Sequence, residues 1–161
     1  MNTLDQEIEQ FRRSHDGRII QGASHTCRIL NNQVRNKYVI QSFTALRKLN
    51  LDFDSIACSG FSGAMIVPQI AELMNKNIIL VRKTVEKTYS EFVIEGVAPS
   101  RYIIVDDLIC SGSTVKHIIR SIKDEHPRAI CMGVYTYMKD ECAYRNNPKF
   151  CRIHLGIDYL Q

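Results

Sequence analysis

Two adjacent carboxylates followed by a small polar loop are the residues of this chain best suited to chemistry. The apolar run Ile103-Ile-Val ends in Asp106-Asp107, and the loop Cys110-Ser-Gly-Ser-Thr114 follows after two more apolar residues. A helix-like pattern starts within the loop, so unpaired backbone amides and the helix dipole would favour an anion there. Gly112 lets the backbone turn and approach a ligand closely, and three hydroxyl side chains add donors. This arrangement predicts a phosphate-binding loop.

The acids decide what kind of phosphate compound would fit. Carboxylates beside a phosphate would repel it unless a sugar with free hydroxyls or a metal ion lies between them. Two plainer explanations stay open, namely an ordinary helix N-cap by Ser111 or Ser113, and acids that end the strand and face water. The segment as a whole favours a phosphorylated ligand, with a sugar or a metal ion between its phosphate and the acids, over either of them.

The residues upstream exclude two better-known phosphate sites. A P-loop nucleotidase requires the pattern G-x-x-x-x-G-K-[ST]. The Gly-rich stretch that precedes the acids is Gly60-Phe-Ser-Gly63, and no lysine follows it. The G-x-G-x-x-G pattern of a dinucleotide-binding fold is absent as well.

Short apolar runs alternate with helical patterns through the middle of the chain. We expect strands at 55–58, 77–81, 102–105 and 129–137, and helices at 64–75 and 113–124. This alternation predicts βαβ units around a parallel sheet, with the ligand beyond the carboxyl ends of the strands. The loops that emerge at that edge are 59–63, 82–92 and 106–114. One site built from these three loops is the expectation.

The patterns are weaker outside this region. We expect helices at 3–14 and 34–49, short β-like pieces at 18–20, 27–30 and 92–94, and a last strand at 153–157. Pro68 falls within the expected helix 64–75, where proline is tolerable only in the first turn.

Length and composition fit one domain and exclude several classes of protein. The chain has 161 residues, of which 45% are hydrophobic and 24% charged, so it can bury a substantial core. The net charge of +4 suits an anionic small ligand and is weak support for nucleic acid. No two of the six cysteines are spaced as C-x-x-C, which argues against a zinc or redox motif. Because neither a signal peptide nor a membrane-length apolar run is seen, a reducing cytoplasm is the expected setting.

The run from Ile103 to Thr114 resembles the signature of the type I phosphoribosyltransferase family. That signature is an apolar strand, two acids, two apolar residues, a variable residue and then Thr-Gly-x-Thr, and this chain has Ser111 for the first Thr. The resemblance extends more loosely from about residue 34 to residue 138. It implies an α/β, Rossmann-like fold with a central parallel sheet and helices on both faces. The whole chain 1–161 would be one domain, with a small hood from its N- and C-terminal segments.

The resemblance implies an enzyme that moves 5-phosphoribose from phosphoribosyl pyrophosphate to a nitrogenous base and releases pyrophosphate. Asp106 and Asp107 would face the ribose hydroxyls and act in catalysis. The 5′-phosphate would bind the loop of Cys110, Ser111, Gly112, Ser113 and Thr114. Mg²⁺ would be the cofactor, held mainly by the pyrophosphate and ribose oxygens of the substrate, near the two acids.

The resemblance also implies where the leaving pyrophosphate lies. It would contact Ser59, Gly60, Phe61, Arg82, Lys83 and Lys87. Arg82-Lys83 resembles a pair found in adenine- and orotate-type members, and Lys87 would lie on a loop that closes over the site. Cations there would stabilise the charge that grows on pyrophosphate, which makes Lys83 a candidate catalytic residue. A solvated basic loop is the alternative explanation.

The acceptor base depends on a single position. Hypoxanthine-type members usually have Asp where this chain has Cys110, so the sequence favours an adenine-, xanthine- or orotate-type acceptor. Leu30-Asn-Asn-Gln-Val34 resembles a base-binding segment of xanthine-type enzymes. Tyrosines that could stack on a base are Tyr135, Tyr137, Tyr144 and Tyr159, although core or interface positions are the expected places for most of them.

Two other functions stay open. Some proteins of this fold bind phosphoribosyl pyrophosphate as a regulatory signal and catalyse little, but they usually lose the cations that this chain keeps. An enzyme that uses the same scaffold with a different acceptor is the other alternative. As partners we expect the two small-molecule substrates and a second copy of the chain, with no membrane and no nucleic acid.

Overall fold

The computed structural model describes residues 24–83, 92–109, 111–138 and 153–154. The helix expected at 3–14, the β-like piece at 18–20 and the terminal segments of the expected hood lie outside these residues. Within them, no helix is long and apolar enough to cross a membrane.

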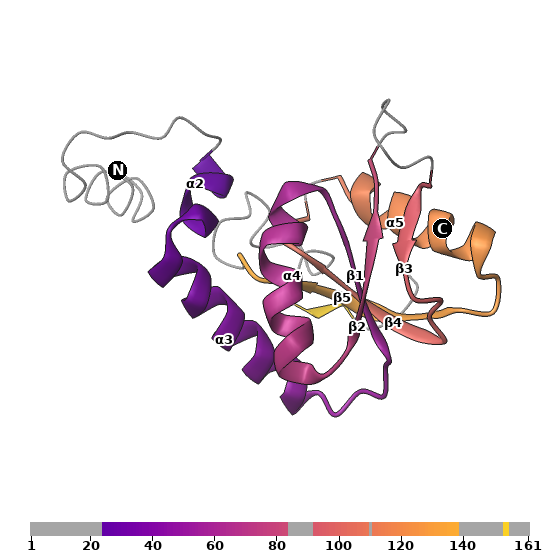
Figure 1. Ribbon diagram of the computed structural model, residues 1–161, viewed down its shortest axis with the longest axis horizontal. Coiled ribbons are helices and arrows are strands. Elements are labelled where there is room, and N and C mark those ends of the chain that lie inside the picture. The colour runs from indigo at the N-terminus through magenta and orange to yellow at the C-terminus, as the bar shows by residue number, and fades with distance from the viewer. Residues whose placement is uncertain (1–23, 84–91, 110, 139–152, 155–161) are drawn as a thin grey trace.

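A single mixed sheet forms the centre of the molecule (Figure 1). Its strands are β1 (Ser55–Ser59), β2 (Asn77–Val81), β3 (Ile94–Gly96), β4 (Arg101–Asp106), β5 (Ile130–Thr136) and β6 (Ile153–His154), in the order β3-β2-β1-β4-β5-β6. Strands β2, β1, β4 and β5 run parallel, and β3 and β6 are antiparallel edges. The predicted parallel core is therefore confirmed.

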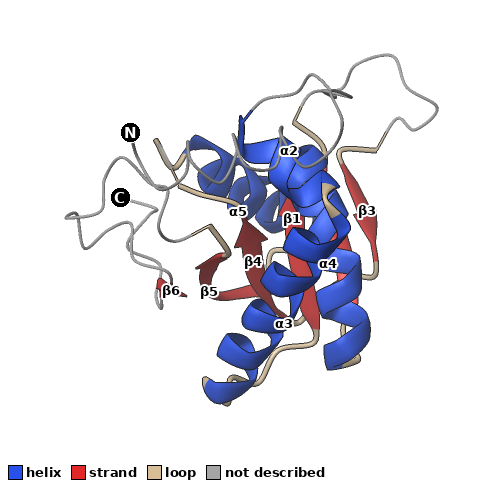
Figure 2. Ribbon diagram, turned by 90° about the vertical axis from the view of Figure 1, so that its left-hand side faces the viewer, coloured by secondary structure: helices blue, strands red, loops and turns tan. Residues whose placement is uncertain are grey.

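Helices cover both faces of the sheet, as expected (Figures 1 and 2). They are α2 (Ser24–Leu30), α3 (Asn32–Lys48), α4 (Gly60–Met74) and α5 (Ser113–Glu125). Helices α3 and α4 pack on one face, where Leu46 and Ile70 are buried against Ile103 of β4. Helix α5 covers the other face, with its apolar stripe of Val115, Ile118, Ile119 and Ile122 buried as the periodicity predicts.

Two of the expected short strands are wrong. Residues 27–30 belong to helix α2 instead of a strand, and Ile29 of that helix is buried against the helical layer. The strand expected at 92–94 lies at Ile94–Gly96 instead, where it pairs antiparallel with β2. Short apolar runs do not distinguish a strand from a buried helix turn, and tertiary contacts decide between them.

Helix α4 begins four residues earlier than expected. Gly60 has φ +70°, a left-handed conformation that lets the chain turn from β1 directly into the helix. Pro68 therefore lies in the helix interior, against the expectation that it sits in the first turn. Pro68 has no amide N–H, so the carbonyl of Ala64 loses its usual partner in the helix. Both residues are exposed, so water can solvate that carbonyl.

Asp54 fixes the relative position of the two central strands. Its Oδ2 accepts hydrogen bonds from the amides of Ser100 and Arg101, both at 2.9 Å, and so joins the start of β1 to the start of β4. Partial burial would raise the pKa of Asp54, but hydrogen bonds from Ser55, Arg101 and Ser100 and the charge of Lys76 outweigh it and lower the pKa. This anchor joins the amino ends of the two strands, at the edge of the sheet opposite the one where the site loops emerge.

Replacing Gly63 with Ala is expected to destabilise the fold. A Cβ at Gly63 would lie 2.7 Å from the Cβ of Cys58, inside a close contact between α4 and β1. The clash should lower the free energy of unfolding by about 1–3 kcal/mol, as measured by urea denaturation. Ala64→Gly at the neighbouring exposed position is the control, because it measures the helix-propensity difference alone, about 1 kcal/mol. A Gly63→Ala protein as stable as the wild type would contradict this packing.

Candidate active site

Between the central strands β1 and β4 the order in which the chain adds strands to the sheet reverses, although the strands stay parallel. From β1 the chain passes to α4 on one face and then to β2, and from β4 it passes to α5 on the other face and then to β5. Loops at the carboxyl ends of two such neighbouring strands diverge and leave a crevice, where open α/β sheets bind their ligands. The acid pair stands at the end of β4 and therefore at this crevice.

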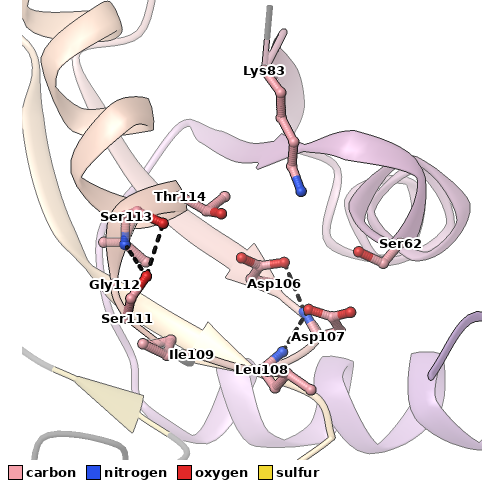
Figure 3. Close-up of a pocket in the computed structure, with 11 residues that line it drawn as sticks. Ser62, Lys83, Asp106, Asp107, Leu108, Ile109, Ser111, Gly112, Ser113 and Thr114 are labelled. Atoms are coloured by element: carbon pink, nitrogen blue, oxygen red, sulfur yellow. Dashed lines mark hydrogen bonds between the residues drawn. The ribbon is translucent and has the colours of Figure 1, made fainter. Parts of the chain in front are cut away.

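A pocket of about 230 Å³ opens at the crevice (Figure 3). It is lined by Ser62, Lys83, Asp106, Asp107, Leu108, Ile109, Ser111, Gly112, Ser113, Thr114 and Val115. These residues come from the start of α4, the end of β2 and the segment between β4 and α5. The three expected site loops thus contribute to one pocket.

The two acids are nearly buried and rigidly held. Asp106 and Asp107 are 6% and 9% exposed, and each carboxylate accepts the next backbone amide, at 2.9 Å for Asp107 N and 2.7 Å for Leu108 N. Their carbonyls accept the amides of Tyr137 and Met138, at 3.1 and 3.0 Å. Each carboxylate keeps one oxygen without such a backbone bond, and that oxygen can bind a ligand.

Asp106 has an unusual acidity. Burial, and then the neighbouring charge of Asp107, raise its pKa from 3.8 to about 7, although the charge of Lys83 lowers it. A carboxyl with such a pKa binds a proton more easily than an exposed acid does. Ligand hydroxyls or a cation in the pocket would compensate the buried negative charge.

The loop that precedes α5 has the helix-start geometry that its sequence predicts. Gly112 is the N-cap of α5 with φ 76°, a left-handed conformation suited to glycine. The Ser111 hydroxyl donates to the Ser113 hydroxyl at 2.9 Å and accepts the Ser113 amide at 3.3 Å. The next amides of the first turn have no partner inside the helix, so they are available to an anion.

A second helix N-terminus faces the same pocket. Helix α4 starts at Gly60, and Ser62 in its first turn lines the pocket. The Tyr137 hydroxyl donates to the Ser62 carbonyl at 3.2 Å, and the ring of Tyr38 packs against Tyr137 with a centroid distance of 5.5 Å. Burial, and then the charges of Asp107 and Asp106, raise the pKa of Tyr137, so its hydroxyl stays protonated and donates.

Lys83 is the cation that lines the pocket among the described residues. Figure 3 shows its ammonium group directed into the pocket, toward Asp106. The side chain also passes close to Gly60, where an added Cβ would lie 3.0 Å from its Cε. Arg82 points elsewhere, because its Nε donates to the Glu95 carboxylate at 2.7 Å.

The structure brings together most of the residues singled out in the sequence. Those that line the pocket are Lys83, Asp106, Asp107, Ser111, Gly112, Ser113 and Thr114. The Ser59 side chain is buried at the end of β1, and Phe61 is exposed. Cys110 and Lys87 lie outside the described residues.

Sequence reasoning gave no role of its own to four lining residues. Ser62, Leu108 and Ile109 lie in the expected site loops, and Val115 was assigned to the helix stripe. Ser62 lines the pocket because α4 begins at Gly60, and the glycine before a serine-containing first turn was the available signal. The apolar lining residues were assigned only to the signature or to the helix stripe, since their pattern indicates a core position equally well.

The pocket offers few protein ligands to a metal ion. The described residues contain no group of three or more His, Cys, Asp or Glu side chains that could enclose a metal ion. Asp106 and Asp107 offer the hard oxygen ligands that Mg²⁺ prefers, but only two carboxylates. The residues therefore fit a magnesium ion that takes most of its ligands from a substrate and water.

The pocket combines groups of both signs. Two helix N-termini and Lys83 attract anions, and two buried carboxylates attract hydroxyls or a cation. A ligand with anionic groups at two ends and hydroxyls between them satisfies all of these at once.

The fold is that of the phosphoribosyltransferases. In the solved structures, adenine phosphoribosyltransferase of Saccharomyces cerevisiae, complexed with an imino-altritol bisphosphate and adenine, superposes with a TM-score of 0.56 at 18% identity, covering 84% of this chain and 88% of that one. Orotate phosphoribosyltransferase of Francisella tularensis also gives a TM-score of 0.56, at 14% identity, covering 67% of this chain and 53% of that one. At such low identity these similarities establish the fold alone.

In sequence, the chain is similar to adenine phosphoribosyltransferase of Caldicellulosiruptor saccharolyticus. The two are 30% identical over 111 residues, which cover 59% of this chain and 63% of that protein. The match thus spans less than two thirds of the relative's length. No protein-family model matches the sequence. The resemblance to type I phosphoribosyltransferases is confirmed, in sequence by the adenine-type relative and in fold by the adenine- and orotate-type structures.

Proposed function

We propose that the protein is a phosphoribosyltransferase, which moves 5-phosphoribose from phosphoribosyl pyrophosphate to a nitrogenous base. The observation that carries this proposal is one pocket that joins a phosphate-binding helix N-terminus, two buried carboxylates and a lysine. The sequence similarity to adenine phosphoribosyltransferase supports it. A phosphorylated pentose with a pyrophosphate group has the anionic ends and central hydroxyls that such a pocket requires.

Each part of the pocket has a role in the proposed reaction. The loop from Ser111 to Thr114 binds the 5′-phosphate, and Asp106 and Asp107 accept hydrogen bonds from the ribose hydroxyls. As the bond from carbon 1 of the ribose to pyrophosphate breaks, carbon 1 becomes positively charged. The base nitrogen bonds to carbon 1 and releases its proton to water or to the departing pyrophosphate. The carboxylates stabilise that positive charge, and Lys83 stabilises the negative charge on pyrophosphate.

Magnesium is part of the proposal. Asp106 and Asp107 would hold it together with oxygens of the substrate. When bound, the ion would neutralise charge on the pyrophosphate. The residues themselves bind and orient the sugar, and the helix N-termini fix its phosphate.

The remaining features of the proposal follow the sequence resemblance. The site residues proposed for pyrophosphate include Ser59, Gly60, Phe61, Arg82 and Lys87 in addition to Lys83. The acceptor is an adenine-, xanthine- or orotate-type base, since Cys110 replaces the Asp of hypoxanthine-type members. We also propose a single domain, a cytoplasmic setting and a homodimer.

A regulatory protein that binds phosphoribosyl pyrophosphate is the second candidate. The presence of Lys83 in the pocket favours the enzyme, because a regulatory protein has no leaving group whose charge must be stabilised.

A panel of bases is the test of the proposed activity. Purified protein with Mg²⁺ and phosphoribosyl pyrophosphate should release pyrophosphate with one of adenine, guanine, hypoxanthine, xanthine, orotate, uracil or nicotinamide. We expect adenine, xanthine or orotate to react and hypoxanthine not to, as measured by a coupled pyrophosphate assay. Binding of phosphoribosyl pyrophosphate by calorimetry without turnover of any base would favour the regulatory protein.

A further inference from the structure

The backbone of Arg82, immediately before Lys83, is held from two sides. The Arg82 amide donates to the Val93 carbonyl at 2.9 Å, beside the antiparallel edge strand β3. On the other side, Nε2 of His117 lies 2.7 Å from the Arg82 carbonyl oxygen. The Arg82 side chain is engaged with Glu95 of β3. The backbone is therefore fixed immediately before the residue whose side chain enters the pocket.

His117 belongs to the helix that starts at the phosphate-binding loop. It lies four residues after Ser113, the first residue of α5, and so occupies the turn that follows the phosphate-binding amides. Helix α5 packs against β1 and β2. The same helix thus offers its N-terminus to the pocket and contacts the strand end that carries Lys83.

We propose that His117 is a positioning residue that aims Lys83 through the Arg82 carbonyl. The carbonyl can only accept, so Nε2 of the imidazole must carry the hydrogen. The Arg82 carbonyl and the Lys83 amide nitrogen belong to one planar peptide group, and fixing the first orients the second. In the proposed transferase, helix α5 would therefore set the distance between the 5′-phosphate loop and the cation at the leaving pyrophosphate.

His117→Phe is the informative substitution, since it keeps a ring and removes the donor. We expect kcat for the transferase reaction to fall about 10- to 100-fold, because a displacement of about 1 Å in an active site has an effect of that size. His117→Gln should recover most of the loss, since its amide nitrogen is as many bonds from Cα as Nε2 and can donate. The exposed Arg120 on the same helix provides the control, Arg120→Ala, which should behave as wild type.

A double-mutant cycle separates positioning from a general structural role. If His117 acts through Lys83, His117→Phe should have almost no further effect in a Lys83→Met background. Thermal midpoints of all variants identify any that are unfolded. A folded His117→Phe protein whose loss of kcat is the same in both backgrounds would overturn the inference, as would failure of His117→Gln to restore activity.

The inference rests on the proposed function. Calorimetric binding of phosphoribosyl pyrophosphate distinguishes failure of the positioning role from failure of the transferase proposal. If the wild type transfers to a base and His117→Phe equals it in both kcat and Kd, the positioning role is wrong and the transferase stands. If the wild type binds phosphoribosyl pyrophosphate but transfers it to no base, the transferase is wrong. The positioning role then requires that His117→Phe raise Kd several-fold and do so only when Lys83 is present. Absence of both turnover and binding in the wild type would overturn both proposals.

Discussion

Replacing Asp106 with Asn is expected to abolish transfer and, at the same time, to stabilise the fold at neutral and alkaline pH. Activity should fall at least about 100-fold, because the amide no longer carries the charge that stabilises the positive ribose. Stability should rise because the variant no longer has to bury an ionised carboxylate. A purely structural acid would show the opposite combination, with lost stability and retained turnover.

The sign of the stability change follows from the raised pKa of Asp106. Its pKa is about 7 in the folded protein, against 3.8 without burial, so below about pH 4 the carboxyl is protonated in both states and costs nothing. As the pH rises toward 7 the unfolded chain loses its proton first, and the wild type loses stability until the folded carboxyl also ionises. The free-energy difference between Asp106→Asn and wild type should therefore grow from pH 4 to 7 and then level off, at a few kcal/mol, since one pK unit corresponds to about 1.4 kcal/mol.

Urea unfolding at several pH values between 4.5 and 8 measures this difference directly. Asp124→Asn is the matched control, because Asp124 is an exposed acid on α5 and its loss changes the net charge equally. Its stability difference from wild type should vary little over the same range. Wild-type turnover in Asp106→Asn, or a stability difference that shrinks as the pH rises, would contradict the role given to this carboxylate. Asp107→Asn should also abolish transfer without unfolding the protein.

Features carried by consecutive residues were predictable from the sequence. The acid pair and the loop that ends at Thr114 are neighbours in the chain, and each strand and helix of the core has its own periodic pattern. Local amide geometry and apolar alternation determine these features, so they appear at the expected positions. The convergence of three loops on one pocket followed from the rule for parallel sheets.

Features that depend on distant contacts were not predictable in this way. Helix α2 was expected to be extended, because its apolar residues become informative only when Ile29 meets the helical layer. The strand Ile94–Gly96 forms because it pairs with β2, and its own three residues carry little signal. His117 and Arg82 are 35 positions apart, and a polar residue within an amphipathic helix usually only faces solvent. Such pairings exist only in the folded chain.

Lys83→Met is expected to produce the other large loss of activity. The substitution keeps the length and apolar stem of the side chain but removes its charge, and the pocket then holds two carboxylates with no described cation beside them. We expect kcat to fall about 100- to 1000-fold, since one electrostatic contact made in the transition state has that value. Because pyrophosphate gains charge only as it leaves, KM for the base should change little.

The pH dependence distinguishes loss of this charge from loss of packing. The charge of Lys83 lowers the pKa of Asp106, so its removal should raise that pKa further. In a pH-rate profile, protonation of Asp106 produces the acidic limb, which is the fall in rate toward low pH. This limb should shift to higher pH in Lys83→Met. Lys83→Arg should leave the limb near its wild-type position even if kcat falls, because the charge is kept. Lys123→Met, at an exposed site on α5, should change neither kcat nor the limb. An unshifted limb in Lys83→Met would mean that the lysine does not act on the acid pair, and wild-type kcat would exclude it from the reaction.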